Sequence, residues 1–350
     1  MTGNKIDGSA ENESSGFGYV LVDAPEQVVT PTEENDIPAA LDFKIMASGG
    51  QSTVASAVPK NERNSEAYQS EVELENAFIK QLQRQAYEYI QVESEESLIA
   101  NLRYQLEQLN DIQFSDSEWK RFFKSSIASD NDGIIEKTRR IQEDYIQVLK
   151  RDDGSSKNIW LIDKTNIHNN RLQAMNQYTV QGVHENRYDV TILVNGLPLV
   201  HIELKRRGVA IKEAFDQIER YQRDSFWSGC GLFEYVQIFV ISNGTNTKYY
   251  SNTTRMGHIN EMGNSSKGSR KKTSNSFEFT MWWAAANNKP IRDLVPFTST
   301  FFAKHSLLNI LSKYCVFTEE ELLLVMRPYQ IVATEAILNR ILISENNKKM

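Results

Sequence analysis

Three charged side chains interrupt two neighbouring apolar segments in the middle of the chain. Asp189 lies in YDVTILV (188–194), and Glu203 and Lys205 lie two residues apart in LVHIELK (199–205). Two carboxylates can bind a hard cation such as Mg²⁺, and the carbonyl oxygen of Leu204 could be a further ligand. The cation neutralises phosphate charge and lowers the pKa of a bound water, while a lysine stabilises developing negative charge. The set therefore predicts phosphodiester hydrolysis, provided that the fold brings the three residues together.

The Asn195-Gly196 pair between the two segments indicates a β-hairpin. In this hairpin Glu203 and Lys205 point to one face, because side chains alternate along a strand. We expect a three-residue loop with Gly196 in the left-handed conformation, which sets Asp189 opposite His201 and diagonal to Glu203. A two-residue turn would place the two acids on opposite faces, unless a β-bulge corrects the register.

An ordinary exposed ion pair across two strands is the competing interpretation of these charges. Three features favour the metal site. The two strands are otherwise nearly all apolar, Lys205 is followed directly by Arg206 and Arg207, and the next helix carries Gln217 and Tyr221 at i,i+4 spacing. His201 alternates with Glu203 and could line the site, but a packing role is favoured for it.

The segments around the hairpin alternate between helical and strand-like periods. Ser70 and Glu73 form a capping-box pattern, and Leu74, Phe78 and Leu82 follow at helical spacing. Further helices are expected around 98–109, 119–123 and 208–224, and strands at 145–149, 159–162, 177–180 and 235–244. This order predicts an α/β domain built around a mixed sheet.

The whole composition fits a protein that buries a sizeable core. The chain has 350 residues, 40% of them hydrophobic, and a net charge of −7. That charge argues against a generally basic nucleic-acid coat without excluding DNA. Cys230 and Cys315 are too far apart for a CxxC zinc motif. Without a signal peptide or a long apolar run, we expect a cytoplasmic protein.

Two polar stretches differ from the rest. Residues 1–64 are rich in Ser, Gly, Asn, Glu and Pro, which predicts a mobile tail, with 18–22 as one possible added strand. Lys267, Arg270, Lys271 and Lys272 lie among Gly, Ser and Asn and predict a solvated basic loop. Trp282 and Trp283 are expected in the core or at a domain interface.

The motifs Asp…Glu-x-Lys and Gln-x-x-x-Tyr resemble those of the PD-(D/E)xK nucleases of the RecB-like branch. More specifically, RYDVTILVNGLPLVHIELKRRG (187–208) and LLLVMRPYQIVATEAI (322–337) resemble the restriction, or motor, subunit of type I restriction–modification enzymes. The likeness covers about residues 65–350. It implies a PD-(D/E)xK nuclease fold, with a central mixed β-sheet flanked by helices, over 65–298. A linker and the start of a RecA-like motor domain would occupy 299–350.

The resemblance also implies roles for single residues. Asp189 and Glu203 would bind Mg²⁺, Lys205 would assist the attacking water, and Gln217 and Tyr221 would support DNA placement or the geometry of the site. Some members of the superfamily use a glutamate on the first helix, for which Glu71 and Glu75 are candidates. Arg327 and Gln330 of the RPYQ segment would belong to an adenine-recognition element, although RPYQ alone could equally be a helix start with Pro in its first turn.

The resemblance further implies an endonuclease that cleaves double-stranded DNA after ATP-driven translocation. Its partners would be the methylation and specificity subunits. No G-x-x-x-x-G-K-[ST] phosphate loop occurs in the sequence. ATP would therefore act only in a full-length protein, and we expect a fragment or a truncated gene. A non-catalytic DNA-docking or assembly module, or a free-standing nuclease, are the alternatives.

Overall fold

The computed structural model describes residues 45–49, 52–56, 70–181, 185–253, 276–285 and 287–348. The possible strand at 18–22 and the basic loop at 267–272 lie outside the described residues. Within the segment predicted as a tail, strands β1 (Ile45–Gly49) and β2 (Ser52–Ser56) pair antiparallel. The prediction for residues 1–64 did not include this strand pair.

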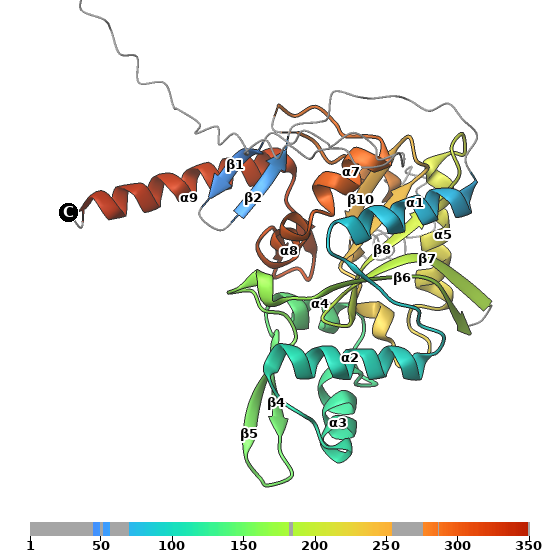
Figure 1. Cartoon of the computed structure of the whole chain (residues 1–350), viewed down its shortest axis with the longest axis vertical. Coiled ribbons are helices and arrows are strands. Elements are labelled where there is room, and N and C mark those ends of the chain that lie inside the picture. The colour runs from blue at the N-terminus through green and yellow to red at the C-terminus, as the bar shows by residue number, and fades with distance from the viewer. Residues whose placement is uncertain are drawn as a thin grey trace, which may run out of the picture.

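A six-stranded mixed sheet lies at the centre of the fold (Figure 1). Its order is β10-β9-β8-β7-β6-β3, where β3–β6 and β8–β9 are parallel and the other neighbours are antiparallel. Helices flank this sheet, so the predicted α/β class is confirmed. The strands are β3 (Glu88–Tyr89), β6 (Leu172–Gln181), β7 (Glu185–Val194), β8 (Leu197–Leu204), β9 (Ile238–Ser242) and β10 (Thr247–Ser251).

Two predicted strands lie outside the central sheet. β4 (Ile146–Lys150) and β5 (Ser156–Trp160) pair only with each other and form a hairpin that extends beside α3 (Asp116–Phe122) and α2 (Glu95–Asn110) in Figure 1. Hydrophobic period correctly predicted strands here, but period alone does not say which strand pairs with which. The π-helical segment η1 (Phe123–Ile127) continues α3 directly.

Helix α1 (Glu71–Arg84) begins as the sequence predicts. Ser70 Oγ accepts a hydrogen bond from the Glu73 amide at 3.2 Å, and Glu73 Oε2 accepts one from the Ser70 amide at 2.9 Å. This reciprocal cap satisfies two amide groups that a helix start leaves unpaired. Leu74, Phe78 and Leu82 are all buried. α1 contacts β8 and β3, and α5 (Ile211–Asp224) contacts β8 and β9.

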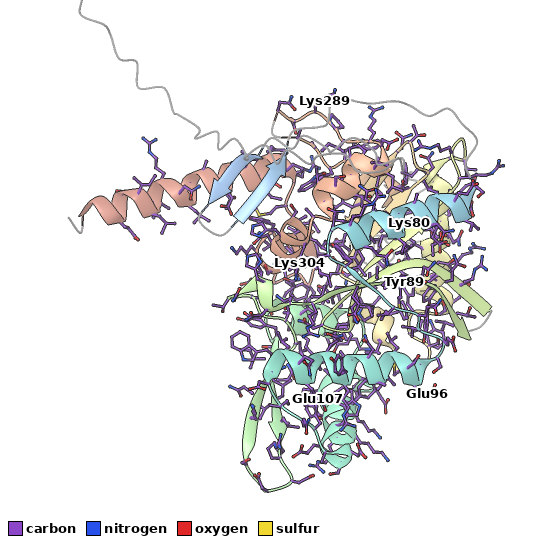
Figure 2. The ribbon with its side chains drawn as sticks, viewed as in Figure 1. Lys80, Tyr89, Glu96, Glu107, Lys289 and Lys304 are labelled. Carbon is purple, nitrogen blue, oxygen red and sulfur yellow. The ribbon has the colours of Figure 1, made fainter. Side chains whose placement is uncertain are left out.

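The C-terminal helices continue the core beyond the sheet. The Phe78 ring on α1 meets the Phe302 ring at 5.5 Å, and Trp283 packs against Tyr249 and Phe301, so its predicted place in the core is confirmed. Figure 2 shows side chains filling the space between these elements, whereas Lys80 and Glu96 are exposed.

The remaining elements are α4 (Ile134–Gln142), η2 (Ile167–Asn169), η3 (Leu232–Tyr235), η4 (Ser276–Phe279), α7 (Leu294–Phe301), α8 (Lys304–Lys313), β11 (Cys315–Phe317), β12 (Leu323–Val325) and α9 (Pro328–Lys348). Among the described helices, none is both long and apolar enough to cross a membrane.

The β7–β8 turn is pressed against α2, which gives a direct test of this packing. Gly196 has φ +82°, and a Cβ there would lie 2.6 Å from Leu102 Cα. We expect Gly196→Ala to lower the free energy of unfolding by about 2–4 kcal/mol, the sum of left-handed strain and overpacking. Gly154→Ala is the matched control, because Gly154 has φ +85° and its Cβ would meet no described atom within 4 Å. It should lose only about 1 kcal/mol. Equal losses in urea denaturation would contradict the close packing on α2.

Candidate active site

The hairpin that carries the candidate residues has a two-residue turn, so the predicted three-residue loop is wrong. Asn195 (φ +50°) and Gly196 (φ +82°) form the turn, and Val194 pairs with Leu197 across it. Positive φ at both positions is the hallmark of a type I′ turn, which matches the twist of the flanking strands. Buried hydrogen bonds fix the first position: the Asn195 side-chain Nδ2 donates to Leu161 O (3.1 Å) and Asn170 Oδ1 (2.7 Å).

A β-bulge in β8 restores the register that the site needs. Leu193 pairs with Pro198, but Ile192 pairs with Val200, so Leu199 is the extra residue. Beyond the bulge His201 faces Thr191, not Asp189 as we expected. The pairing ends at Val190–Ile202, so Asp189 and Glu203 are the next residues on the two strands. Pro198 was the sequence signal for this bulge, because a proline inside a strand is largely confined to edges and bulges.

The three charged residues meet at the C-terminal end of β8. Asp189 Oδ2 accepts a hydrogen bond from the Leu204 amide at 2.8 Å. Lys205 Nζ donates to Glu203 Oε1 at 3.0 Å and to the Leu204 carbonyl oxygen at 3.2 Å. Glu203 is 0% exposed, so its charge is removed from water. The structure therefore brings together Asp189, Glu203, Lys205 and the backbone of Leu204.

Burial raises the pKa of both acids. Burial raises the pKa of Asp189 to about 8, and the nearby Glu203 carboxylate adds to the shift. Burial also raises the pKa of Glu203 to about 7, although the Lys205 ammonium opposes the shift. Burial by itself would lower the pKa of Lys205, but the Glu203 and Asp189 carboxylates outweigh it and raise that pKa. The lysine therefore stays charged near neutral pH, while the two acids compete for protons.

His201 is buried next to the acid pair, which consists of Asp189 and Glu203. It is 0% exposed, its Nδ1 lies 3.2 Å from Thr191 Oγ1, and burial lowers its pKa to about 4. The aromatic rings of Tyr188, Tyr221, Phe226 and Phe239 surround the imidazole edge-on at 5.5–6.3 Å. The favoured packing role agrees with this neutral, enclosed imidazole.

A cation fits the atoms present at this site. Glu203 Oε2 is buried and has no hydrogen-bond partner among the described residues; His201 Nε2, 3.7 Å away, is likewise unpaired. Carboxylate and carbonyl oxygens are the ligands that Mg²⁺ uses, and Mg²⁺ keeps several waters besides one or two carboxylates. Within the described ranges no three acidic, His or Cys side chains form a metal cluster. The available donors are thus the two carboxylates and the Leu204 carbonyl.

Gln217 and Tyr221 lie beside the site on α5. The Gln217 side-chain amide donates to the Tyr221 hydroxyl, which in turn donates to the Arg187 carbonyl oxygen at 2.8 Å. Tyr221 is only 3% exposed, so the pair is not an ordinary polar pair on an exposed face. The two residues tie α5 to β7 two positions before Asp189.

The two glutamates of the first helix have different surroundings. Glu71 Oε1 accepts a weak hydrogen bond from the Arg206 amide at 3.4 Å, and its charge helps to raise the pKa of Glu203. Glu75 is buried, and its two carboxylate oxygens accept hydrogen bonds from the side chains of Asn176 and Gln177. Of the two candidates, Glu71 is the one that lies near the acid pair. Sequence reasoning did not single out Asn176 or Gln177.

The RPYQ segment lies in a separate part of the described structure. The Arg327 amide donates to Gln330 Oε1 at 2.8 Å, and Pro328 is the first residue of α9. This side-chain cap fits a helix start with Pro in its first turn. It leaves the adenine-recognition role of Arg327 and Gln330 as a prediction.

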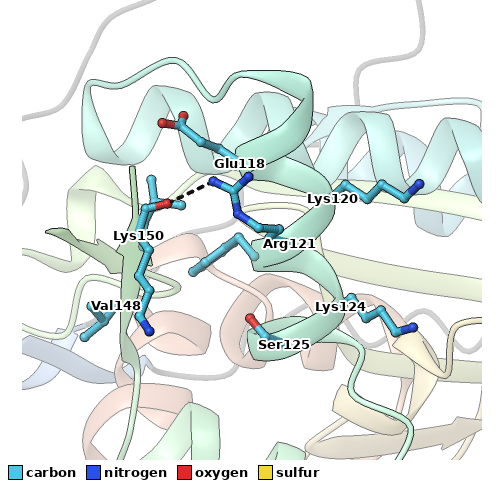
Figure 3. A pocket seen from close by; sticks show the side chains of 9 residues that line it. Glu118, Lys120, Arg121, Lys124, Ser125, Val148 and Lys150 are labelled. Atoms are coloured by element: carbon cyan, nitrogen blue, oxygen red, sulfur yellow. Dashed lines mark hydrogen bonds between the residues drawn. The ribbon is translucent and has the colours of Figure 1, made fainter. Parts of the chain in front are cut away.

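The pocket in Figure 3 lies elsewhere, between α3 and β4, and has a volume of about 590 Å³. Its rim is basic, with Lys120, Arg121, Lys124 and Lys150. The carboxylate that lines it, Glu118, is paired with Arg151 at 3.1 Å. None of the acid pair, Lys205, Gln217 or Tyr221 lines this pocket, so the candidate chemistry is not located there.

Comparison with known proteins gives a consistent group of matches. A family model described as type I restriction enzyme R protein N terminus matches residues 68–258. The chain is 50% identical over 277 residues to the type I restriction enzyme EcoprrI endonuclease subunit of Escherichia coli, covering 79% of this chain and 83% of that protein. It is 36% identical over 286 residues to the SsaAORF53P endonuclease subunit of Staphylococcus saprophyticus, covering 80% of this chain but only 28% of that protein.

The raised pKa values predict how stability depends on pH. Unfolded Asp and Glu release their protons near pH 4, whereas Asp189 in the folded chain does so near pH 8. Between these values the folded chain binds more protons, so stability falls as pH rises towards 8. In EDTA we expect Tm to drop between pH 6 and pH 8.5, and Asp189→Asn to reduce that drop by about 3 °C or more. Glu320→Gln, an exposed control, should leave the drop unchanged; equal drops in wild type and Asp189→Asn would refute the buried-acid account.

Proposed function

Because the chain belongs to the family of type I restriction enzyme R protein N-terminal regions, we propose that it carries the nuclease centre of an endonuclease subunit. The family resemblance drawn from the sequence is thereby confirmed. The five candidate residues from Asp189 to Tyr221 all lie inside the matched region 68–258. The observation that carries the proposal is the convergence of Asp189, Glu203 and Lys205 around the Leu204 backbone.

The proposed reaction is Mg²⁺-dependent hydrolysis of a DNA phosphodiester bond. A bound Mg²⁺ would neutralise phosphate charge and lower the pKa of a coordinated water. Asp189 and Glu203 would hold the ion. The Leu204 amide orients Asp189 through its 2.8 Å hydrogen bond, and Lys205 fixes one oxygen of Glu203 at 3.0 Å. This leaves Glu203 Oε2 available as a ligand.

Lys205 would have two roles at this centre. Its ammonium group balances part of the buried negative charge before substrate binds, and its remaining hydrogen can contact the attacking water or a phosphate oxygen. Gln217 and Tyr221 would hold α5 against β7, so that the strand carrying Asp189 keeps its place. Arg206, exposed directly after Lys205, would contact the phosphate backbone.

The wider activity of the family would be carried by a longer protein. The chain spans 28% of the Staphylococcus relatives that it matches. We propose that ATP-driven translocation on double-stranded DNA is performed by helicase-like motor domains beyond the nuclease domain (65–298). Arg327 and Gln330, within 299–350, would contribute to adenine recognition there. The methylation and specificity subunits of the restriction complex would be the partners.

Substitution of the site residues in the assembled enzyme tests this function. Asp189→Asn and Lys205→Ala, each in the full-length subunit with its partners and ATP, should reduce Mg²⁺-dependent cleavage of supercoiled plasmid by about 100-fold or more. ATP hydrolysis should continue at the wild-type rate, because these side chains lie in the nuclease domain.

Glu320→Gln serves as the matched control, since it removes an exposed carboxylate outside this centre. Unchanged cleavage in both site variants would assign the hairpin charges a structural role. It would then favour a non-catalytic docking or assembly module with a nuclease fold.

A further inference from the structure

The strand that pairs with the Asp189 region has an irregular point directly opposite that residue. β6 and β7 pair from Leu172–Val194 to Gln181–Glu185 with constant register, yet the pairing passes from Asn176–Val190 to Tyr178–Tyr188. The skipped position is the one at which Gln177 would face Asp189. Gln177 has φ +56°, a left-handed conformation that is unfavourable for any residue with a Cβ.

Side-chain contacts show that β7 is also irregular at this point. Thr191 Oγ1 lies 3.2 Å from His201 Nδ1, and the Tyr188 ring lies 5.5 Å from the same imidazole. Residues three apart on a regular strand point to opposite faces. Because Tyr188 and Thr191 contact one side chain, the alternation breaks between them, where Asp189 lies. The Asp189 side chain then accepts the Leu204 amide on the neighbouring strand.

A buried carboxylate holds Gln177 in this conformation. Glu75 accepts a hydrogen bond from the Gln177 side-chain amide on one oxygen and from the Asn176 side-chain amide on the other. The Tyr89 hydroxyl donates to Asn176 Oδ1 at 2.8 Å, which fixes the orientation of that amide. Both oxygens of the Glu75 side chain are thus occupied by these amides, and the residue is only 5% exposed. Backbone strain persists only where the surroundings determine it, as this network does.

We propose that Gln177, held by Glu75, is a positioning residue that opens the β6–β7 ladder and directs the Asp189 carboxylate to the Leu204 amide and the metal. The inference rests on the proposed function for its link to the metal. Glu75, in this view, is no metal ligand: its two oxygens are engaged with β6. A Gln177 restored to an extended conformation would re-form the ladder and move the Asp189 carboxylate away from the Leu204 amide.

The test uses the full chain and Mn²⁺ alone as the probe. A β-branched residue opposes φ above zero, so Gln177→Val should weaken Mn²⁺ binding in calorimetry at least about tenfold, the usual range for residues that orient metal ligands. Gln177→Gly, which permits the left-handed conformation, should bind more tightly than Gln177→Val. Glu75→Gln, which has one acceptor oxygen for two donors, should also weaken binding.

Gln173→Ala is the matched control on the same strand. Gln173 is 1% exposed and exchanges hydrogen bonds with Asn101 at 2.9 and 3.1 Å, but it pairs with Leu193, away from Asp189. Gln173→Ala should lower Tm and leave the Mn²⁺ affinity unchanged. A merely structural Gln177 would behave in the same way.

A second readout needs no metal. The Leu204 amide resonance reports the hydrogen bond to Asp189, so Gln177→Val and Asp189→Asn should both shift it, whereas Gln173→Ala should not. Wild-type Mn²⁺ affinity for Gln177→Val with an unshifted Leu204 amide would overturn the inference. A wild-type chain that binds no Mn²⁺ through Asp189 would instead refute the proposed function, and the Leu204 resonance would still decide the role of Gln177.

Discussion

The register between β7 and β8 determines whether this chain has an acid pair at all. A two-residue turn without further irregularity would place Asp189 opposite Ile202. The single extra residue Leu199 shifts the pairing by one, so that Thr191 faces His201, Val190 faces Ile202, and Asp189 and Glu203 are the next residues on the two strands. Because the side-chain period of a strand is two, this one-residue shift decides whether Asp189 and Glu203 lie on opposite faces of the sheet or close together. The fit to a metal ion and the proposed role of Lys205 both depend on this register.

The acid pair creates an unbalanced negative charge in a buried part of the protein. With both acids ionised and Lys205 protonated, two negative charges and one positive charge leave a net charge of −1 in a largely buried place. Burial makes that state unfavourable, and it raises the pKa of Asp189 to about 8 and of Glu203 to about 7. In the proposed function, a bound divalent cation would supply the missing positive charge and displace the protons. Neutral His201 and its ring of aromatic side chains keep water from the inner side of the site.

Local sequence signals predicted where helices, strands and turns form better than they predicted which strands pair. The Ser70–Glu73 capping box and the Asn195-Gly196 turn depend on nearby residues, and both form as the residue types require. The β4–β5 hairpin has the expected strands but is detached from the central sheet, since periodicity carries no information on long-range pairing. Pro198 is compatible with a bulge, but it is equally compatible with an edge strand, so it does not fix the register by itself. The left-handed Gln177 has no local signal, because the acceptor of its side-chain hydrogen bond is Glu75, 102 residues earlier.

Helix α1 connects the candidate site to the C-terminal part of the described chain. Its first turns contribute Glu71 beside Arg206 and Glu75 beneath β6. Its last turns meet α7, where the Gln81 side-chain amide donates to Val295 O at 2.8 Å and to Ser299 Oγ at 2.7 Å. Helix α1 is one continuous helix of fourteen residues, so the carboxylate that contacts Gln177 and the side chain that contacts α7 belong to the same element. Through Gln177, Glu75 and α1, the part of β6 next to Asp189 is therefore connected to α7, outside the sheet on which the site is built.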